Sequence, residues 1–370
     1  KYEKHFVEEF SIEGKKLNHY KLETTANNQV VKSFNAYVIV DEEFEICSIT
    51  NSNSGVEKFE PLEKNHPRLY FTFPLIGSEE IGIPFVINSL QFDPKVERNG
   101  IYLKSGNDKT DVVRNKTIIE SGLQIATEVF TKLSIIRNIE GVFELLNFKA
   151  AKDYTWIDHS WLNGLKRETL DSLSTIEFIK VADNDNPTSF NDLTVPYSSY
   201  EEKSIKIYEL FKNLSNRSVV RESELYNWIN ICKNHVEIRE LDIFEITPIC
   251  GIKELIHLLA EFSDLETFTS NLINADPYEW LNDFYEITDT LFDSFPLSNE
   301  ILLNQEGQFR APEGMFWDKC NDPELNAISK SLGLNFPTKL ISSDIKRFTI
   351  SGIVDFYENQ AVAQIKTVLN

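Results

Sequence analysis

The sequence predicts an α+β protein, with an N-terminal mixed sheet covered by a long helix and then a mainly helical region with short β-hairpins. The first observation is a series of β-branched and aromatic runs between residues 32 and 88, separated by turn-forming clusters. The second is a stretch after residue 115 in which apolar residues recur every three or four positions, the spacing of an amphipathic helix. A sheet followed by a helix that can cover one of its faces makes an α+β unit.

The β-type runs come first in the chain. β-branched and aromatic residues fit the pleated, half-buried surface of a sheet, so each run predicts one strand. The runs are Phe34–Val40, Phe44–Ile49, Leu69–Phe73 and Phe85–Ile87. The long helix is predicted to begin after Asn115, a candidate N-cap, and to continue for about six turns, as far as Ile136. Residues 1–150 are therefore expected to form one α+β domain, with an arginine in the loop before the long helix.

Residues 151–298 are expected to form a mainly helical domain. Thr247-Pro248 and Asp276-Pro277 each place a proline at the first position of a predicted helix, where its missing N–H does no harm. Two short β-like pairs lie between helices, and their recurrence suggests a hairpin-plus-helix unit used more than once. The pairs are Thr175–Val181 with Leu193–Val195, and Glu300–Leu303 with Gln308–Phe309.

Residues 299–370 are expected to form a small α/β C-terminal unit. Asp355 and Lys366 have the order found in a restriction-type nuclease site. Gln364, however, stands where a second carboxylate would be needed, and magnesium binding relies on carboxylate oxygens. A terminal β-hairpin is therefore predicted here in place of a nuclease site.

The composition excludes several classes of protein. With 370 residues, of which 41% are hydrophobic, the chain is long enough to form two or three folded units. Its 37 basic and 58 acidic residues give a formal charge of −21, which repels phosphate polyanions, so direct binding of nucleic acid is not expected. The four cysteines never form a C-x-x-C pair, so they are expected to be inert thiols of a reducing compartment. No apolar run suggests a membrane span, and we expect a cytoplasmic protein.

Common catalytic motifs do not occur in this sequence. The six histidines are scattered, without the paired spacing that metal sites use, so no metal ligands are expected. There is no Walker loop, no dinucleotide fingerprint and no nucleophile elbow. Hydrolase, P-loop and dinucleotide-binding functions are therefore not indicated.

The segment between Phe73 and the long helix carries the strongest functional pattern. Phe73–Gly77 and Pro84–Asn88 are followed by Arg98 and then by the helix. This order resembles the region after the ATP-binding domain in sacsin-like proteins of the gyrase, chaperone, histidine kinase and mismatch-repair (GHKL) ATPase superfamily. More distantly, it is similar to the middle domain of the ninety-kilodalton heat-shock chaperones, in which a strand leads through a loop to an arginine and a helix.

The resemblance implies that Arg98 contacts the terminal phosphate of ATP held in a preceding domain, as both the catalytic and the cofactor-binding residue of this segment. An arginine suits that role because its guanidinium is always ionised and offers a fork of donors to two oxygens. ATP and Mg are expected in the preceding domain, because the superfamily's nucleotide-pocket motifs do not occur here. The chain, which opens on Lys1, is expected to be a piece of a longer chaperone-like ATPase that couples the ATP state to conformational change.

Two departures from the family pattern favour a different class of protein. Glu97 replaces the serine before the arginine, and Tyr102 stands where the chaperones carry a glutamine near the phosphate. Both fit a non-catalytic protein-interaction scaffold that kept the architecture, and they leave open whether ATP is hydrolysed. Besides the preceding domain, the expected partner is a protein client or a second copy of the chain in a homodimer. The resemblance further implies a role in bacterial antiviral defence, which large ATPases of this type often serve.

Overall fold

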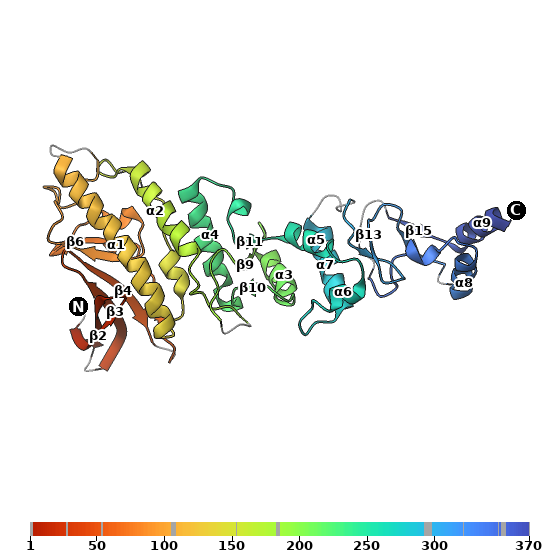
Figure 1. The fold of residues 1–370 in the computed structure, drawn as a ribbon, viewed down its shortest axis with the longest axis horizontal. Coiled ribbons are helices and arrows are strands. Elements are labelled where there is room, and N and C mark those ends of the chain that lie inside the picture. Colours follow the sequence, from red (N-terminus) through yellow and green to blue (C-terminus); the bar gives the residue numbers. More distant parts are fainter. Residues whose placement is uncertain are drawn as a thin grey trace. The chain divides into compact units, whose positions relative to one another are not determined.

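The chain forms two compact units. The computed structural model describes residues 3–26, 29–52, 55–104, 109–152, 154–182, 186–291, 298–320, 322–346, 348 and 353–369. The first unit consists of Lys1–Leu193 and Val220–Ile249, and the second of Thr194–Val219 and Cys250–Asn370. These bounds differ from the three segments expected from the sequence, and that three-part division stays a prediction. The α+β class is confirmed (Figure 1).

The first unit is built on a mixed sheet, as the sequence predicts. Its described strands follow the order β1-β2-β3-β4-β8-β6-β7, with β5 paired to β4. All pairs are antiparallel except β6 with β8, which are parallel. The strands are β1 (Glu3–Ile12), β2 (Lys15–Ala26), β3 (Gln29–Val40), β4 (Glu45–Asn51), β5 (Lys58–Phe59), β6 (Leu69–Phe71), β7 (Phe73–Pro74) and β8 (Val86–Asn88).

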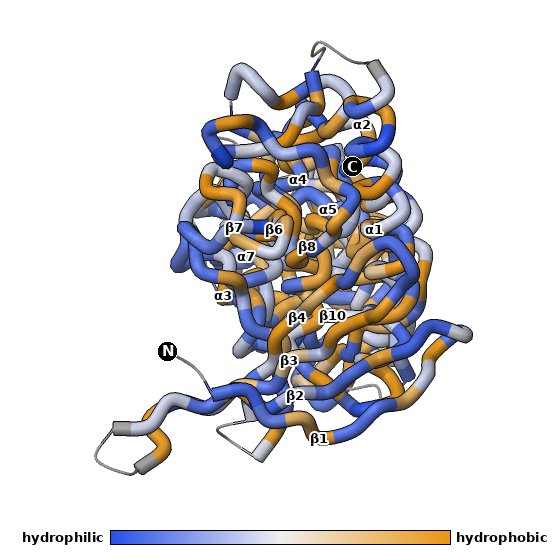
Figure 2. The backbone as a smooth tube through the Cα atoms, turned by 90° about the vertical axis from the view of Figure 1, so that its left-hand side faces the viewer, coloured by the Kyte–Doolittle hydropathy of each residue, from blue (hydrophilic) through white to orange (hydrophobic). Residues whose placement is uncertain are grey.

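Three strands of this sheet, β1, β2 and β5, are absent from the sequence prediction. Most side chains of β1 are exposed, and charged residues occupy four of its ten positions. Figure 2 shows blue, hydrophilic stretches as well as orange ones in β1, and orange, hydrophobic stretches in β4 and β8. A strand with little buried surface has no strong apolar alternation, and alternation is the signal on which strand prediction depends.

The long helix, α1 (Lys109–Ile136), lies along the sheet (Figure 1). Its Gly122 packs against Ile87 of β8, and the Phe130 ring stacks on Phe85 with centroids 5.3 Å apart. The predicted start of the helix was wrong, because Asn115 is not the N-cap but a buried residue well inside the helix. The first turn is mostly polar and does not reach the core, so apolar periodicity could not mark it.

Further helices complete the first unit. α2 packs on both α1 and α4. Asp158 caps α2 by accepting the Trp161 N–H at 3.2 Å, and it also pairs with Lys116 of α1, with Nζ and Oδ2 2.6 Å apart. The helices are η1 (Ser78–Ile81), η2 (Val142–Leu146), α2 (His159–Ser174), η3 (Glu222–Glu224), α4 (Leu225–Arg239) and η4 (Ile243–Glu245).

Three short strands form a separate sheet with the order β10-β9-β11. They are β9 (Leu193–Pro196), β10 (Ser218–Val219) and β11 (Ile249–Cys250). The predicted pairing of Thr175–Val181 with Leu193–Val195 was therefore wrong, since within the described residues Ile179 bridges Thr188 instead. The prediction that Pro248 opens a helix was also wrong. The chain first forms β11, and α5 (Ile252–Leu259) starts only after Gly251, whose N–H donates to the Glu254 carboxylate at 2.6 Å.

In the described residues of the second unit, four helices precede its C-terminal part. α7 begins at Pro277 as predicted, and the Asp276 carboxylate accepts the N–H groups of Tyr278 and Glu279 at 2.9 Å each. Trp280 of α7 lies in an aromatic cluster with Phe268 and Phe284. The helices are α3 (Glu201–Lys212), α5 (Ile252–Leu259), α6 (Leu265–Thr269) and α7 (Pro277–Leu291).

The C-terminal part confirms one predicted hairpin and contradicts another. β12 (Leu302–Leu303) pairs with β13 (Phe309–Arg310) around a turn that begins at Asn304, as predicted. The terminal hairpin was wrong, because β15 (Val354–Phe356) pairs in parallel with β14 (Phe316–Asp318) and is followed by α9 (Glu358–Leu369). Ala361 and Ile365 of α9 are buried four residues apart, which is helical spacing. The remaining helices here are α8 (Pro323–Ser331) and η5 (Phe336–Thr338).

Candidate functional site

Arg98 lies at the tip of a short hairpin between β8 and α1. Pro94 and Ile101 form an antiparallel bridge across its arms. The Lys95 N–H donates to the Gly100 carbonyl at 2.9 Å, and the Arg98 N–H donates back to the Lys95 carbonyl at 2.9 Å. These two bonds close a tight turn. The loop between the predicted strand and the predicted helix therefore has a defined conformation.

The backbone of Arg98 adopts a conformation that side chains disfavour. Its φ is 55°, in the left-handed region that glycine occupies freely. For a residue with a Cβ, this conformation costs about 1–2 kcal/mol. Strain of this kind persists only where the surrounding structure holds it, and it is more frequent at functional sites than elsewhere.

The Arg98 side chain is exposed and rests on an aromatic ring. Its Cζ lies 4.6 Å from the centroid of the Phe73 ring of β7. A cation above an aromatic face is stabilised by about 0.5–1 kcal/mol at an exposed position. Within the described part of the chain, no carboxylate pairs with this guanidinium. The fork of donors is thus free to bind an anion from outside the chain.

The other side of the hairpin rests on Trp156. A Cβ built on Gly100 would lie 2.5 Å from Cε2 of the indole, and Trp156 itself is buried. Trp156 lies just before Asp158, the N-cap of α2 that pairs with α1. The segment that joins α1 and α2 therefore packs against the hairpin.

Replacing Gly100 with alanine is expected to lower the free energy of unfolding by about 2–4 kcal/mol, since the new Cβ overlaps the indole and φ is +148°. Urea unfolding of this chain measures the effect. Gly164→Ala on α2 is the matched control, because no atom lies within 4 Å of its new Cβ. Alanine at a helical glycine is expected to stabilise by about 0.5–1 kcal/mol. Equal effects of the two changes would show that Gly100 is not packed against Trp156.

The segment that contains the hairpin and the start of α1 is basic in sequence, although the whole chain is acidic. Residues 94–116 contain six basic and three acidic residues, a net charge of +3 in a chain of −21. The basic residues are Lys95, Arg98, Lys104, Lys109, Arg114 and Lys116, and the acidic ones are Glu97, Asp108 and Asp111. A local positive field attracts anions that the rest of the surface repels.

Exposed apolar side chains lie beside Arg98. Val96, in the same turn, is 88% exposed, and Ile76 is 68% exposed. Ile76 is next to Gly77, where an added Cβ would lie 3.1 Å from the Asn99 carbonyl oxygen. Apolar side chains around a single arginine are typical of the surfaces that proteins use to bind one another.

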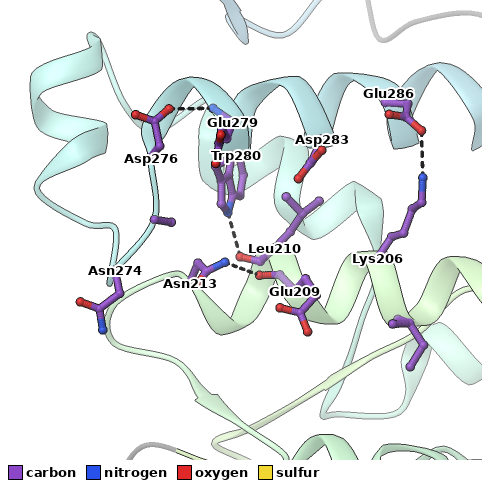
Figure 3. Close-up of a pocket in the computed structure, with 12 residues that line it drawn as sticks. Lys206, Glu209, Leu210, Asn213, Asn274, Asp276, Glu279, Trp280, Asp283 and Glu286 are labelled. Atoms are coloured by element: carbon purple, nitrogen blue, oxygen red, sulfur yellow. Dashed lines mark hydrogen bonds and ion pairs between the residues drawn. The ribbon is translucent and has the colours of Figure 1, made fainter.

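A groove of about 380 Å³ lies between α3 and α7 of the second unit (Figure 3). The Trp280 indole N–H donates to the Leu210 carbonyl at 2.9 Å across it, and Lys206 pairs with Glu286 at 2.8 Å. Its lining includes five carboxylates and a single lysine; the acids are Glu209, Asp276, Glu279, Asp283 and Glu286. An acidic groove disfavours the binding of phosphate groups.

The described residues give no support for a metal site, a reactive thiol or a membrane-spanning helix. Among the described residues, no group of three or more His, Cys, Asp or Glu side chains could hold a metal ion. None of the four cysteines forms a disulfide, and burial raises the pKa of the Cys47 thiol to about 12 and that of Cys250 to about 11. These two thiols are therefore inert, as expected. None of the helices in the described part of the chain has the length and apolar character needed to span a bilayer.

Comparisons of this chain with protein-family models, with curated proteins and with solved structures find no match. The candidate site is therefore described from the geometry of this chain alone, without a matching protein. Sequence reasoning selected Arg98 but did not find its supports, Phe73 and Trp156. Both contact the hairpin across long separations in the chain, and no spacing rule connects them to Arg98.

Proposed function

We propose that this chain is the middle region of a sacsin-like, chaperone-type ATPase of the GHKL superfamily, in which Arg98 contacts the terminal phosphate of ATP bound by a preceding domain. The observation that carries the proposal is the Arg98 hairpin. It holds an exposed guanidinium, without a carboxylate partner in the described chain, in a disfavoured backbone conformation. An arginine that is held in a strained conformation, within a segment of net positive charge, is suited to bind an anion.

In this proposal Arg98 acts by electrostatic stabilisation of the terminal phosphate. During phosphoryl transfer, negative charge spreads over the terminal phosphate oxygens, and an arginine supplied from another domain stabilises that charge. ATP and Mg belong to the preceding domain in this proposal. Ile76 and Val96, both exposed beside Arg98, supply the apolar surface against which that domain packs.

The fold around the hairpin suits a coupling role. The loop follows β8 and leads into α1, which packs on the sheet through Gly122 and Phe130. The proposal takes this order of strand, loop and helix as the counterpart of the chaperone middle-domain arrangement that the resemblance implies. A phosphate that holds Arg98 in place would also hold β8 and α1, so the ATP state would reach the rest of the chain as a conformational change.

The test is the ATPase rate of the complete protein with Arg98 replaced. An unchanged rate removes the assignment. A second, simpler observation is the sequence that precedes Lys1, because the proposal requires a complete GHKL nucleotide pocket there.

The second candidate is a non-catalytic protein-interaction scaffold in the same cytoplasmic setting. Glu97 and Tyr102 favour it, since both replace residues that the chaperones carry near the phosphate. The exposed Ile76 and Val96 fit it equally well, as a surface for a protein client or a second copy. A preceding segment without a nucleotide pocket supports this candidate. Phage-plating efficiency with and without the intact gene tests the antiviral role, which either candidate allows.

A further inference from the structure

Asn115 is an unusual residue to find inside a helix core. It lies in the second turn of α1 and is fully buried, with 0% of its surface exposed. Asparagine is a poor helix former because its amide competes for backbone hydrogen bonds. A buried amide also requires partners for its donors and its acceptor. Its partners therefore explain why it is there.

Those partners are the two arms of the Arg98 hairpin. The Asn115 Oδ1 accepts the Asp93 N–H at 2.9 Å, and Nδ2 donates to the Tyr102 carbonyl at 3.0 Å and to the Asp93 carbonyl at 3.3 Å. Asp93 and Tyr102 are the next residues outward from the Pro94–Ile101 bridge. One side chain of α1 thus holds both arms at the base of the hairpin.

We propose that Asn115 is the positioning residue for Arg98, an inference that rests on the proposed function. A hairpin this short is not stable by itself in water. Near the tip, two backbone bonds close the turn, from Lys95 to Gly100 and from Arg98 to Lys95. The three bonds of Asn115 fix the separation of the arms and attach them to α1. The direction in which Arg98 points is set by the helix.

Asn115→Ala removes the clamp and leaves the guanidinium in place. The arms then separate more often, and Arg98 reaches the phosphate for a smaller fraction of the time. In the complete protein we expect kcat for ATP hydrolysis to fall by about 10–100-fold, with KM for ATP changed by less than about twofold, since Arg98 acts on the developing charge.

Asn304→Ala is the matched control. Asn304 is also fully buried, and it too holds backbone groups, accepting the Glu306 and Gln308 N–H groups and donating to the Thr338 carbonyl. It belongs to the turn between β12 and β13 of the second unit. Its loss should destabilise the fold to a similar degree while leaving kcat within about twofold of the parent.

A double variant shows whether Asn115 acts through Arg98. If it does, Asn115→Ala added to Arg98→Ala lowers kcat no further than Arg98→Ala alone. Amide hydrogen exchange of this chain gives an independent readout, in which the Asp93 and Arg98 amides exchange faster in Asn115→Ala and at the parent rate in Asn304→Ala. Should Asn115→Ala fail to fold, Asn115→Ser is measured instead, and it is expected to give an intermediate kcat.

Two outcomes are decisive and different. Faster exchange at the hairpin with an unchanged kcat overturns the positioning role, and a large effect of Arg98→Ala in the same experiment leaves the proposed function standing. An unchanged kcat in Arg98→Ala removes the proposed function itself, and the positioning role with it. Additive losses in the double variant also overturn the positioning role, because they show that Asn115 acts independently of Arg98.

Discussion

Replacing Arg98 with alanine in the complete protein is expected to lower kcat for ATP hydrolysis by about 10²–10³-fold. The change removes a positive charge that meets the phosphate only when the two domains are docked. It deletes an exposed side chain whose contact in the described chain is the Phe73 ring, so the fold should be unaffected. Steady-state ATPase rates and thermal unfolding of the same preparations measure both effects.

Two further substitutions at this position separate charge, shape and backbone strain. Arg98→Lys keeps the charge but loses the planar fork, and it should recover only part of the activity. Arg98→Gly should be as inactive as alanine yet more stable than the parent by about 1 kcal/mol, because glycine adopts a φ of 55° without strain. Arg167→Ala, at another exposed arginine, is the control and should leave kcat unchanged. A parental rate in Arg98→Ala would leave only the scaffold candidate.

The sequence predicts the parts of the fold in which a local pattern and burial coincide. β8 and the body of α1 were predicted because Ile87, Phe130 and their neighbours are buried at regular spacing. The hairpin of β12 and β13 was predicted because its turn residues have the chemistry of a reversal, and Asn304 does accept two backbone N–H groups there. In each case the residues of a short segment are enough to predict the structure of that segment.

The errors occur where exposure or distant contacts decide the structure. β1 exposes most of its side chains, so it lacks a strong apolar alternation. The terminal segment was expected to be a hairpin because Val354 begins a true strand, but that strand pairs in parallel with β14, far away in the chain. Arg98 could be selected from the order of elements around it. The contacts that hold its hairpin come from Phe73, Asn115 and Trp156, and only the folded chain brings these together.

Lys166 of α2 gives the second large effect, on stability. Its side chain is 0% exposed, and its Nζ donates to the Lys149 carbonyl at 2.7 Å. Burial lowers its pKa from 10.5 to about 7. An amine without a counter-charge loses its hydration when buried, and one neutral hydrogen bond does not replace it. On folding, the first unit therefore buries the Lys166 amine, which is protonated in the unfolded chain at neutral pH.

The sign of the pH dependence follows from this difference. Between pH 7 and pH 10.5 the unfolded state binds more protons at Lys166 than the folded state does, so stability contributed by this group rises with pH across that window. Above pH 10.5 the amine is neutral in both states and the penalty vanishes. Below pH 7 it is charged in both states, and the full penalty of about 3–5 kcal/mol applies.

Lys166→Met is accordingly expected to raise the free energy of unfolding at pH 7 by about 2–3 kcal/mol, because an apolar chain of similar length replaces the buried base while the Lys149 carbonyl loses its donor. Urea unfolding at pH 7, 8, 9 and 10 measures the difference between variant and parent, which should shrink as the pH rises. Taking that difference cancels other groups that titrate in the same range, such as the Cys250 thiol. Lys132→Met on α1, where half of the side chain is exposed, should leave both stability and its pH dependence nearly unchanged. If the gain from Lys166→Met were the same at pH 7 and pH 10, the buried amine would have to be charged in the folded protein at both, and an acidic partner would have to lie beside it.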